Sequence, residues 1–463
     1  MIQKAKANGS YVVVIDPIYT KTAQLANEYI AVKPGGDEAL VLAMTKLIFE
    51  RKLEDRDYIK HHVEGFEAYR DYISQLDFEK LCEMSGVSQE KVIQLAMRYA
   101  QDESTILLGY GMQKYKNGGN IICLIDTLGA ITGQIGKSGG GVNYANRVYP
   151  GKLDLDPYKS ECYGESRFFY VSDMSSFIVE NSIKMAVVMK SNLLNQLPDL
   201  SHLETAFNDI EFKVCFDQFL TDTAQACDLF IPCSTVLESE DLLFSSMTNP
   251  YLTYNEKALE PKEALMDEYM FYQALAKKLN LSSYPKVSKK EYLDQVILPL
   301  KADYPELDLE YFKTNYFTLH ESVAWKNQKF LTPSGKFEIH FDKEIACEVQ
   351  DQTYPFRLLT NHSRDALFSQ HFMDEEGRAK AYINSRMADQ MGVLDQEIVY
   401  LELVQGKIEV VLEISDEIGD WIVMMCVGWW KKHGNPNVLT VSGISDLGGQ
   451  VTYNETRVKI YNL

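Results

Sequence analysis

Hydrophobic and polar positions change their spacing along the chain, and these changes predict α/β segments followed by a β-rich segment. The continuous apolar run 11–15, bounded by Gly9 and Asp16, is typical of a strand buried on both faces of a parallel sheet. Residues 39–50 carry apolar side chains at helical spacing. Because the chain enters its first strand after only the end of a helix, we expect residues 1–100 to form a partial α/β domain.

The α/β pattern continues over residues 101–260, where we expect a second α/β domain. The apolar run 105–108 is strand-like, the run 212–216 predicts a buried strand, and residues 120–132 predict a helix. The next segment, 261–350, is charged, rich in tyrosine and partly helical, so we expect a connector.

Short stretches with alternating apolar and polar side chains begin near residue 351. They predict strands at 357–360, 397–403, 407–414, 421–427 and 457–460. Gln405-Gly406 is a hairpin signal between two of these strands. We therefore predict a β-barrel domain over 351–463, and an α/β fold in which parallel-sheet domains precede a C-terminal β-barrel.

The composition of the chain limits its possible binding partners and its possible location in the cell. The net charge of −20 would repel a nucleic-acid backbone, so we expect no nucleic-acid partner. The first nine residues have no apolar signal-peptide core, and the most apolar stretch, 421–430, has about half the length of a bilayer span. We expect a cytoplasmic chain without membrane insertion.

The eight cysteines predict no metal centre, because no two of them are spaced C-x-x-C. Cys227 and Cys233, the closest pair, are six positions apart in a strand-like stretch. We expect reduced, structural cysteines and no metal ligand in this chain.

An aspartate and two threonines follow the first predicted strand, in the stretch Asp16-Pro17-Ile18-Tyr19-Thr20-Lys21-Thr22-Ala23. A carboxylate at the carboxyl end of a parallel strand lies where α/β folds bind nucleotides, and it can accept both N–H groups of a guanine edge. Asp and Thr are also common helix N-caps, so a purely structural role is the alternative.

Three glycine-containing stretches add weaker signals. Gly35-Gly36-Asp37 opens the helix predicted at 39–50, which leaves backbone N–H groups for a phosphate or a pterin. Gly109-Tyr110-Gly111 and the later glycines 133–141 suggest a loop close to another backbone or a flat ligand. A P-loop is excluded because Ile131 stands where its first glycine is required, and no G-x-G-x-x-G supports a nicotinamide enzyme.

The aspartate–threonine stretch occurs a second time, as Asp217-Gln218-Phe219-Leu220-Thr221-Asp222-Thr223-Ala224. Both copies read D-x-x-x-T-x-T-A after a predicted strand. Two copies of one strand-end arrangement predict two similar nucleotide ligands, which favours the binding interpretation over capping.

Taken in order, these stretches resemble the catalytic subunits of molybdopterin oxidoreductases of the dimethyl-sulfoxide-reductase family. Members read IDP-x-x-T-x-T-A, then PG-[TS]-D-x-A-L, then L-x-x-L-T-G-x-I-G-x-x-GGG, and later D-x-F-x-T-x-T-A-x-x-A-D-x-x-L-P. The barrel segment adds Leu358–Arg364, Ile383-Asn384, Asn437–Thr440 and Asp446. The resemblance covers nearly the whole chain and is weakest over 150–180 and 261–330.

The resemblance implies two molybdopterin guanine dinucleotides that chelate one molybdenum or tungsten. One guanine would lie on Asp16 and the other on Asp217, with the barrel covering the pterins. The cofactor-binding residues that it implies are Asp16, Pro17, Thr20, Gly35, Gly36, Asp37, Gly111, Asp217, Thr221, Thr360, His362, Arg364, Asn384 and Asn437.

The sequence also departs from the family pattern. Gly36 stands where many members have Thr or Ser, and Ser385 replaces a proline after Asn384. The cysteine-rich segment for a [4Fe–4S] cluster and the metal ligand of the family have no counterpart here. We therefore expect the C-terminal part of a molybdenum or tungsten oxidoreductase, inactive alone and without a catalytic residue of its own. Its partners would be a small-molecule substrate and an N-terminal half or electron-transfer subunit; the alternative is a non-catalytic cofactor-binding subunit completed by a separately encoded chain.

Overall fold

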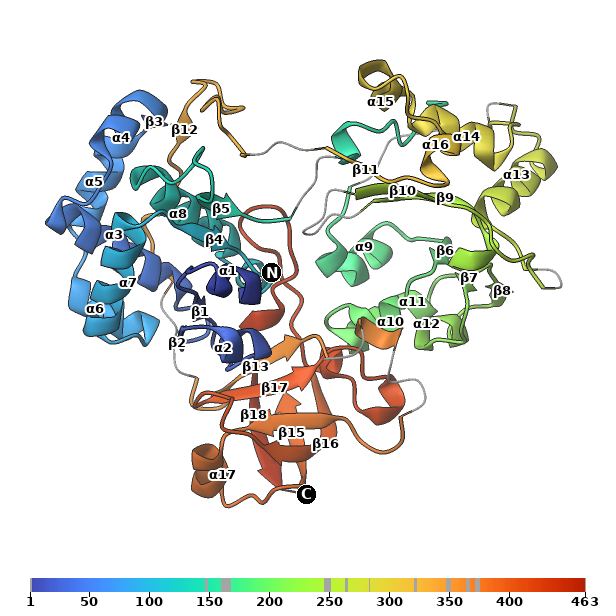
Figure 1. Ribbon diagram of the computed structural model, residues 1–463. Helices are drawn as coiled ribbons and strands as arrows, with labels where there is room; N and C mark the ends of the chain where they lie inside the picture. Colours follow the sequence, from blue (N-terminus) through green and yellow to red (C-terminus); the bar gives the residue numbers. More distant parts are fainter. Residues whose placement is uncertain are drawn as a thin grey trace.

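Two α/β lobes and a β-barrel make up the computed structural model (Figure 1). It describes residues 2–145, 149–159, 168–244, 251–262, 265–282, 284–319, 323–346, 351–363, 367–370 and 375–462. In Figure 1 the first lobe is blue to teal, the second is green to yellow, and the orange-red barrel lies below both.

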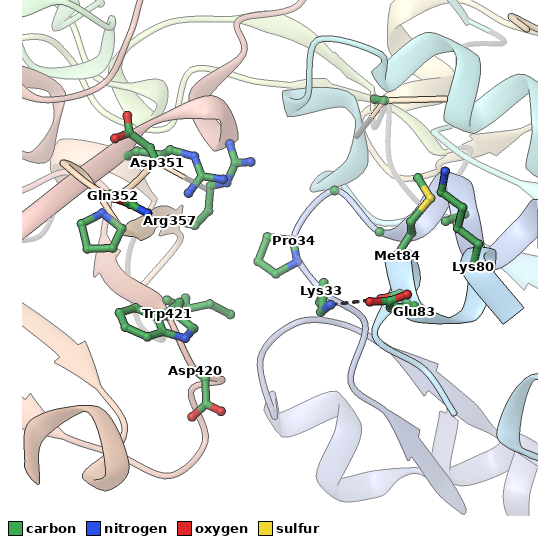
Figure 2. A pocket seen from close by; sticks show the side chains of 17 residues that line it. Lys33, Pro34, Lys80, Glu83, Met84, Asp351, Gln352, Arg357, Asp420 and Trp421 are labelled. Atoms are coloured by element: carbon green, nitrogen blue, oxygen red, sulfur yellow. Dashed lines mark hydrogen bonds between the residues drawn. The ribbon is translucent and has the colours of Figure 1, made fainter. Parts of the chain in front are cut away.

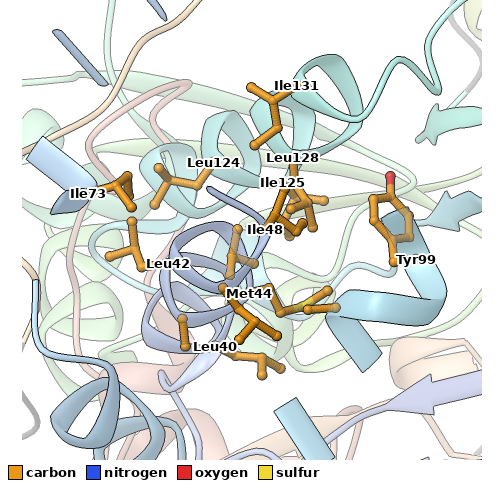
Figure 3. Packing of buried hydrophobic residues seen from close by; sticks show 14 of the residues in the cluster. Leu40, Leu42, Met44, Ile48, Ile73, Tyr99, Leu124, Ile125, Leu128 and Ile131 are labelled. Atoms are coloured by element: carbon orange, nitrogen blue, oxygen red, sulfur yellow. The ribbon is translucent and has the colours of Figure 1, made fainter. Parts of the chain in front are cut away.

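The first lobe is built around helix α3 (Asp37–Arg51), which is buried on almost every side. The sequence pattern suggested a single apolar stripe on this helix, but Glu38 to Thr45 are all buried. The helices around it are α4 (Arg56–His62), α5 (Phe66–Ser74), α6 (Phe78–Ser85), α7 (Gln89–Gln101) and α8 (Gly118–Ile131). Figure 3 shows Leu40 and Ile48 of α3 packed among side chains of these helices.

Short parallel strand pairs line this lobe. They are β1 (Val13–Ile15) with β2 (Glu28–Ile30), β4 (Thr105–Leu107) with β5 (Gly141–Asn143), and β3 (Val63–Glu64) with β12 (Phe337–Glu338). Helix α1 (Ile2–Ala7) precedes β1 and helix α2 (Lys21–Leu25) follows it. The prediction of a first strand buried on both faces is wrong: within the described residues β1 pairs only with β2, and Ile15 is 40% exposed.

The second lobe contains the parallel sheet β6 (Met185–Met189), β7 (Phe212–Asp217) and β8 (Leu229–Pro232). Four helices accompany it: α9 (Met174–Glu180), α10 (Leu193–Gln196), α11 (Leu200–Asn208) and α12 (Asp222–Gln225). An outer antiparallel sheet is formed by β9 (Asp241–Phe244), β10 (Tyr251–Asn255) and β11 (Phe317–Thr318). The strands predicted at 105–108 and 212–216 and the helix at 120–132 are confirmed as β4, β7 and α8.

Residues 261–350, which we expected to act as a connector, contribute to two hydrophobic clusters. The helices in this segment are α13 (Glu268–Lys278), α14 (Lys289–Val296), α15 (Leu298–Asp303) and α16 (Leu309–Phe312). Leu293, Ile297 and Phe312 pack with Tyr149 in one cluster. Further along, Phe341 packs against the first lobe. The segment is therefore part of both lobes.

The C-terminal segment forms the predicted β-barrel. Its strands are β13 (Phe356–Asn361), β14 (Lys380–Ile383), β15 (Ile398–Leu403), β16 (Gly406–Ile414), β17 (Ile422–Cys426) and β18 (Arg457–Asn462), with helix α17 (Ser385–Met391) after β14. The barrel closes in the order β13-β17-β14-β16-β15-β18. β15 and β16 form the hairpin expected at Gln405-Gly406. The predicted fold class is thus confirmed. No helix in the described parts of the chain has the length and apolar character that crossing a bilayer requires.

Candidate functional site

Each D-x-x-x-T-x-T-A copy lies in the same strand–turn–helix–strand unit. The first unit runs from β1 through α2 to β2, and the second from β7 through α12 to β8. The strand registers correspond residue by residue: Val14 is opposite Tyr29 in the first unit, and Cys215 is opposite Phe230, each 201 positions later, in the second. We call residues 12–30 the first grip and residues 213–231 the second grip.

Backbone hydrogen bonds repeat at the same spacing. Asn27 N donates to Val12 O at 2.8 Å, and Asp228 N donates to Lys213 O at 2.9 Å. In return, Val12 N donates to Asn27 Oδ1 at 3.0 Å and Lys213 N donates to Asp228 Oδ2 at 2.7 Å. The resemblance between the two copies therefore extends well beyond the eight-residue motif.

The helix caps in both grips are threonines. Ala23 N donates to Thr20 Oγ1 at 3.2 Å, and Ala224 N donates to Thr221 Oγ1 at 3.1 Å. Asp16 and Asp217 instead lie at the strand ends, where their Oδ1 atoms accept from the nearby backbone N–H groups of Ile18 (2.9 Å) and Gln218 (2.7 Å). Helix capping thus explains the role of Thr20 and Thr221. Asp16 and Asp217 do not cap these helices, and each has one oxygen without a hydrogen bond among the described residues.

The first grip lies beside the start of α3. Gly35 has a φ of +79°, and a Cβ on Gly36 would come within 2.9 Å of Ser85 O. A threonine or serine at position 36 would therefore clash, which accounts for the glycine where many family members have a hydroxyl residue. The Lys33–Gly36 turn also borders a cavity of about 650 Å³ that faces Arg357, Asp420 and Trp421 of the barrel (Figure 2).

Two carboxylates interact near this turn. Burial raises the pKa of Asp37 to about 7, and the negative charge of Asp16 adds to the rise. Burial also raises the pKa of Asp16, although the hydrogen bond from Ile18 N lowers it. Ionising either carboxylate in the folded chain therefore costs free energy. Hydrogen-bond donors of a ligand would stabilise the ionised form.

The raised pKa of Asp37 predicts that the stability of the folded chain depends on pH. Because the folded pKa of Asp37 lies above the ordinary value near 4, its contribution to stability is present below pH 4 and is lost as pH rises towards 7. We expect Asp37→Asn to raise the free energy of unfolding of the chain by about 1–3 kcal/mol at pH 8 and to have little effect at pH 4. Denaturant unfolding at both pH values tests this. Asp57→Asn, at an exposed first-turn position of α4, is the matched control, and an equal response of the two variants would contradict the prediction.

Several buried side-chain amides have one polar atom without a hydrogen bond among the described residues, and two of these amides lie beside the second grip. Asn192 follows β6 and accepts from Thr223 Oγ1 at 2.9 Å, but its Nδ2 has no partner among the described residues. Asn195 Oδ1, Gln113 Oε1 and Asn361 Oδ1 are also buried without a hydrogen bond there. An orphaned buried polar atom usually marks a missing ligand or water. The sequence interpretation missed Asn192 and Asn195, although both follow a parallel strand end next to Asp217.

Three of the remaining predicted residues lie where the barrel meets the first lobe. Thr360 Oγ1 is buried without a partner in the described structure, and Gly111 O accepts from Asn454 Nδ2 at 3.1 Å. His362 packs edge-on against Phe368; partial burial, and then Lys114, lower its pKa. These residues lie where the barrel meets the first lobe. Arg364 lies outside the described residues.

Asn384 and Asn437 have structural bonds. Asn384 caps α17 through Met387 N at 2.8 Å and donates to Asp420 Oδ1 at 2.8 Å. Asn437 Nδ2 donates to Asn195 O at 2.8 Å, which fastens the barrel to the second lobe. Asp446, another residue of the family pattern, accepts from Gly119 N at 2.7 Å at the start of α8. The contacts of these three residues hold elements together around the grips.

Pro17 and Thr20 lie in the segment of the first grip that contacts the barrel. Tyr19 N donates to Glu417 O at 2.9 Å, and Ile18 pairs with Ile418. On the second grip, Lys431 N donates to Asp222 Oδ2 at 3.2 Å. The structure therefore brings the barrel against both grips.

Two parallel-sheet units that repeat one strand-end aspartate are joined to a β-barrel, and comparison with known proteins identifies the family. The family model for molybdopterin oxidoreductases matches residues 1–278, and the model for the molydopterin dinucleotide binding domain matches residues 357–457. The chain belongs to the molybdopterin oxidoreductase family.

Similar proteins agree with this assignment. The chain is 30% identical to the probable oxidoreductase YyaE of Bacillus subtilis, over 96% of this chain and 71% of that protein. It is 26% identical to formate dehydrogenase H of Escherichia coli, over 98% and 69% of the two chains. The structure of acetylene hydratase from Pelobacter acetylenicus superimposes with a TM-score of 0.82 at 18% identity, covering all of this chain and 75% of that one. The last comparison supports the fold.

A further expectation concerns iron. Among the described residues, no three His, Cys, Asp or Glu side chains gather as they would around a metal ion. With the cysteine spacing of the sequence, we expect the purified chain to bind no [4Fe–4S] cluster. An iron assay and the visible absorption spectrum test this expectation, and iron bound in cluster stoichiometry would contradict it.

Proposed function

We propose that this chain holds both guanine dinucleotides of a molybdenum or tungsten bis(molybdopterin guanine dinucleotide) cofactor, one in each grip. The observation that carries the proposal is the repeat of one strand–turn–helix–strand unit with an aspartate at the same strand end. Thr20 and Thr221 are used as helix caps, whereas Asp16 and Asp217 each keep one oxygen without a hydrogen bond among the described residues.

The chemistry of the site suits guanine. A guanine edge offers two adjacent N–H donors, and an ionised carboxylate accepts both in a charge-assisted pair. Asp16 would hold one guanine beside the Gly35–Asp37 turn, where free N–H groups open α3. Asp217 would hold the other, with Asn192 Nδ2 and Asn195 Oδ1 as buried polar atoms that have no partner among the described residues.

The barrel would cover the inner parts of the cofactor with Thr360, Asn361 and His362. Thr360 and Asn361 present buried oxygen atoms without partners in the described structure. His362, whose pKa is lowered, would be a neutral hydrogen-bonding group near pH 7. When bound, the metal and its pterins would supply two-electron redox or oxo-transfer chemistry on a small substrate, with electrons leaving through an electron-transfer partner.

Cofactor analysis tests the proposal. The chain is produced in a bacterial host that makes the guanine dinucleotide cofactor and is purified under anaerobic conditions. Acid treatment releases GMP for chromatography, and elemental mass spectrometry measures molybdenum and tungsten. We expect two guanines and one metal per chain. One guanine per metal, or metal without guanine, would contradict the assignment of two grips.

A further inference from the structure

A small cavity of about 320 Å³ lies beside α9 of the second lobe, the helix whose position Figure 1 shows. Four aromatic rings and two carboxylates line it: Phe168, Phe169, Tyr170, Phe177, Asp173 and Glu180. Asp173 and Phe177 are four positions apart, and Phe177 and Glu180 are three apart, so α9 places them on one face. All six residues fall in the stretch 150–180, where the chain resembles the family pattern least. We call this cavity the α9 cage.

Two ring contacts shape the walls of the α9 cage. Phe169 lies nearly parallel to Phe177, with ring centroids 4.3 Å apart and an interplanar angle of 21°. Phe168 meets Tyr170 edge-on at 5.1 Å. Asp173 N donates to Tyr170 O at 2.9 Å, which closes a turn between the aromatic run and the helix. The cage therefore combines three rings that precede α9 with one ring on the helix.

The barrel holds the aromatic run in place. The ring of Tyr170 packs against Gly449, where a Cβ would come within 2.0 Å of Tyr170 Cε1. Gly449 has a φ of +65°, so both its backbone conformation and the space around it favour glycine. Nearby, Ser442 Oγ donates to Ser172 O. These contacts fix the rings and so lower the conformational entropy that binding of a ligand must remove.

The α9 cage presents both apolar and negatively charged groups to solvent. Phe168 is 80% exposed, Tyr170 is 40% exposed and Phe169 is 38% exposed. Asp173 and Glu180 make no hydrogen bond or ion pair with any described residue, and none of the described lining residues is basic. The carboxylates would repel an anion. A cation with an apolar surface would be attracted by the carboxylates and by the faces of the rings.

We propose that the α9 cage is a binding site for a quaternary ammonium cation. The methyl groups of the cation would contact the rings of Phe169, Tyr170 and Phe177, while Asp173 and Glu180 would balance its charge. A volume of about 320 Å³ lies at the small end of ligand pockets, which suits a cation of this size. The site uses no residue of either grip. It therefore goes beyond the proposed function, and it can be tested whether or not the chain carries a cofactor.

Calorimetric titration of the full chain tests the site. The probes are tetramethylammonium, choline and 3,3-dimethyl-1-butanol, an uncharged molecule with the shape of choline, all at one ionic strength. We expect one saturable site for both cations with a dissociation constant below about 10 mM, and binding of the alcohol that is weaker by at least about tenfold. Equal affinities for choline and the alcohol would overturn the proposal, because they would indicate an apolar surface that does not recognise charge. A titration that saturates with neither cation would also overturn it.

Variants of the cage separate its two contributions. Phe169→Leu removes one ring face but keeps an apolar side chain, whereas Asp173→Asn and Glu180→Gln each remove one charge. We expect each variant to bind choline about 3- to 30-fold more weakly. Phe212→Leu is the matched control, because Phe212 is a 43% exposed ring in β7, outside the cage and the grips. Unchanged affinity in all three cage variants, or an equal loss in Phe212→Leu, would contradict the assignment; circular dichroism confirms that each variant is folded.

Free choline and the choline headgroup of a lipid are two sources of such a cation. Flotation of the chain with phosphatidylcholine vesicles distinguishes them, and phosphatidylglycerol vesicles are the control. If the chain binds choline in the titration, flotation with phosphatidylcholine alone would assign the headgroup, and a chain that stays in solution would assign the free cation. If it binds no cation in the titration, the proposal fails, while the guanine content of the two grips is unaffected.

Discussion

Replacing Asp217 by alanine is expected to weaken retention of the second guanine dinucleotide by about 30- to 700-fold. The carboxylate would accept two N–H bonds from the guanine edge, and its removal would leave both donors unpaired. That loss is about 2–4 kcal/mol, which corresponds to the stated range in affinity. The measurement is the GMP released per chain from purified Asp217→Ala protein, with Asp16→Ala as the equivalent change in the first grip.

The threonine of the same grip provides the matched control. Thr221 Oγ1 caps α12, so Thr221→Ala should lower the free energy of unfolding by about 1 kcal/mol and leave guanine retention largely unchanged. Circular dichroism confirms the fold of each variant. If Asp217→Ala and Asp16→Ala both keep their full guanine content, the aspartates do not hold guanine and the proposed function fails.

The second large effect is expected at Glu38, on the first turn of α3. Its carboxylate is 1% exposed and accepts from Asn117 Nδ2 and Asn120 Nδ2, both at 2.7 Å, and from Ala346 N at 3.0 Å. Glu38 thus joins α3, α8 and the chain before the barrel in one buried network. Glu38→Ala would leave one buried donor (Asn120) and two partly buried donors unpaired, and we expect a loss of about 3–5 kcal/mol in the free energy of unfolding.

Denaturant unfolding measures this loss, and Glu50→Ala on the same helix is its control. Glu50 is 54% exposed and, in the described parts of the chain, pairs only with Lys46 at 3.4 Å, so its removal should cost less than about 0.5 kcal/mol. A difference of under about 1 kcal/mol between the two variants would show that the network contributes little to stability.

Local patterns in the sequence predicted much of the fold because they depend on neighbouring residues. The alternation in 397–403 and 407–414 identified β15 and β16, since one face of each strand is buried. β14 was missed: two of the four residues of Lys380–Ile383 are Lys and Ala, which are depleted in strands. The burial of α3 on almost every side was also missed, because it depends on helices that come later in the chain.

The sequence predicted the parts of the candidate site that occur twice as the same motif. It did not predict the parts that depend on contacts between residues far apart in the chain. The D-x-x-x-T-x-T-A copies are visible in the sequence, and the structure extends them to whole grips. The sequence could not separate the cap from the strand-end carboxylate, because Thr20 and Asp16 are only four positions apart. Asn437 binds a carbonyl 242 positions away, so nothing local indicated its structural role.

The barrel's attachment to both lobes has a consequence for how tightly a two-ended ligand can bind. Asp446 fastens the barrel to α8 of the first lobe, and Asn437 fastens it to Asn195 of the second. A cofactor that carries one guanine at each end is a bivalent ligand, so the first guanine to bind places the second at a high effective concentration near its own grip. This increase in affinity requires a fixed separation between the two grips. A barrel that is bonded to both lobes maintains that separation. Loosening Asn437 should therefore reduce the avidity for the whole cofactor while each single guanine binds as before.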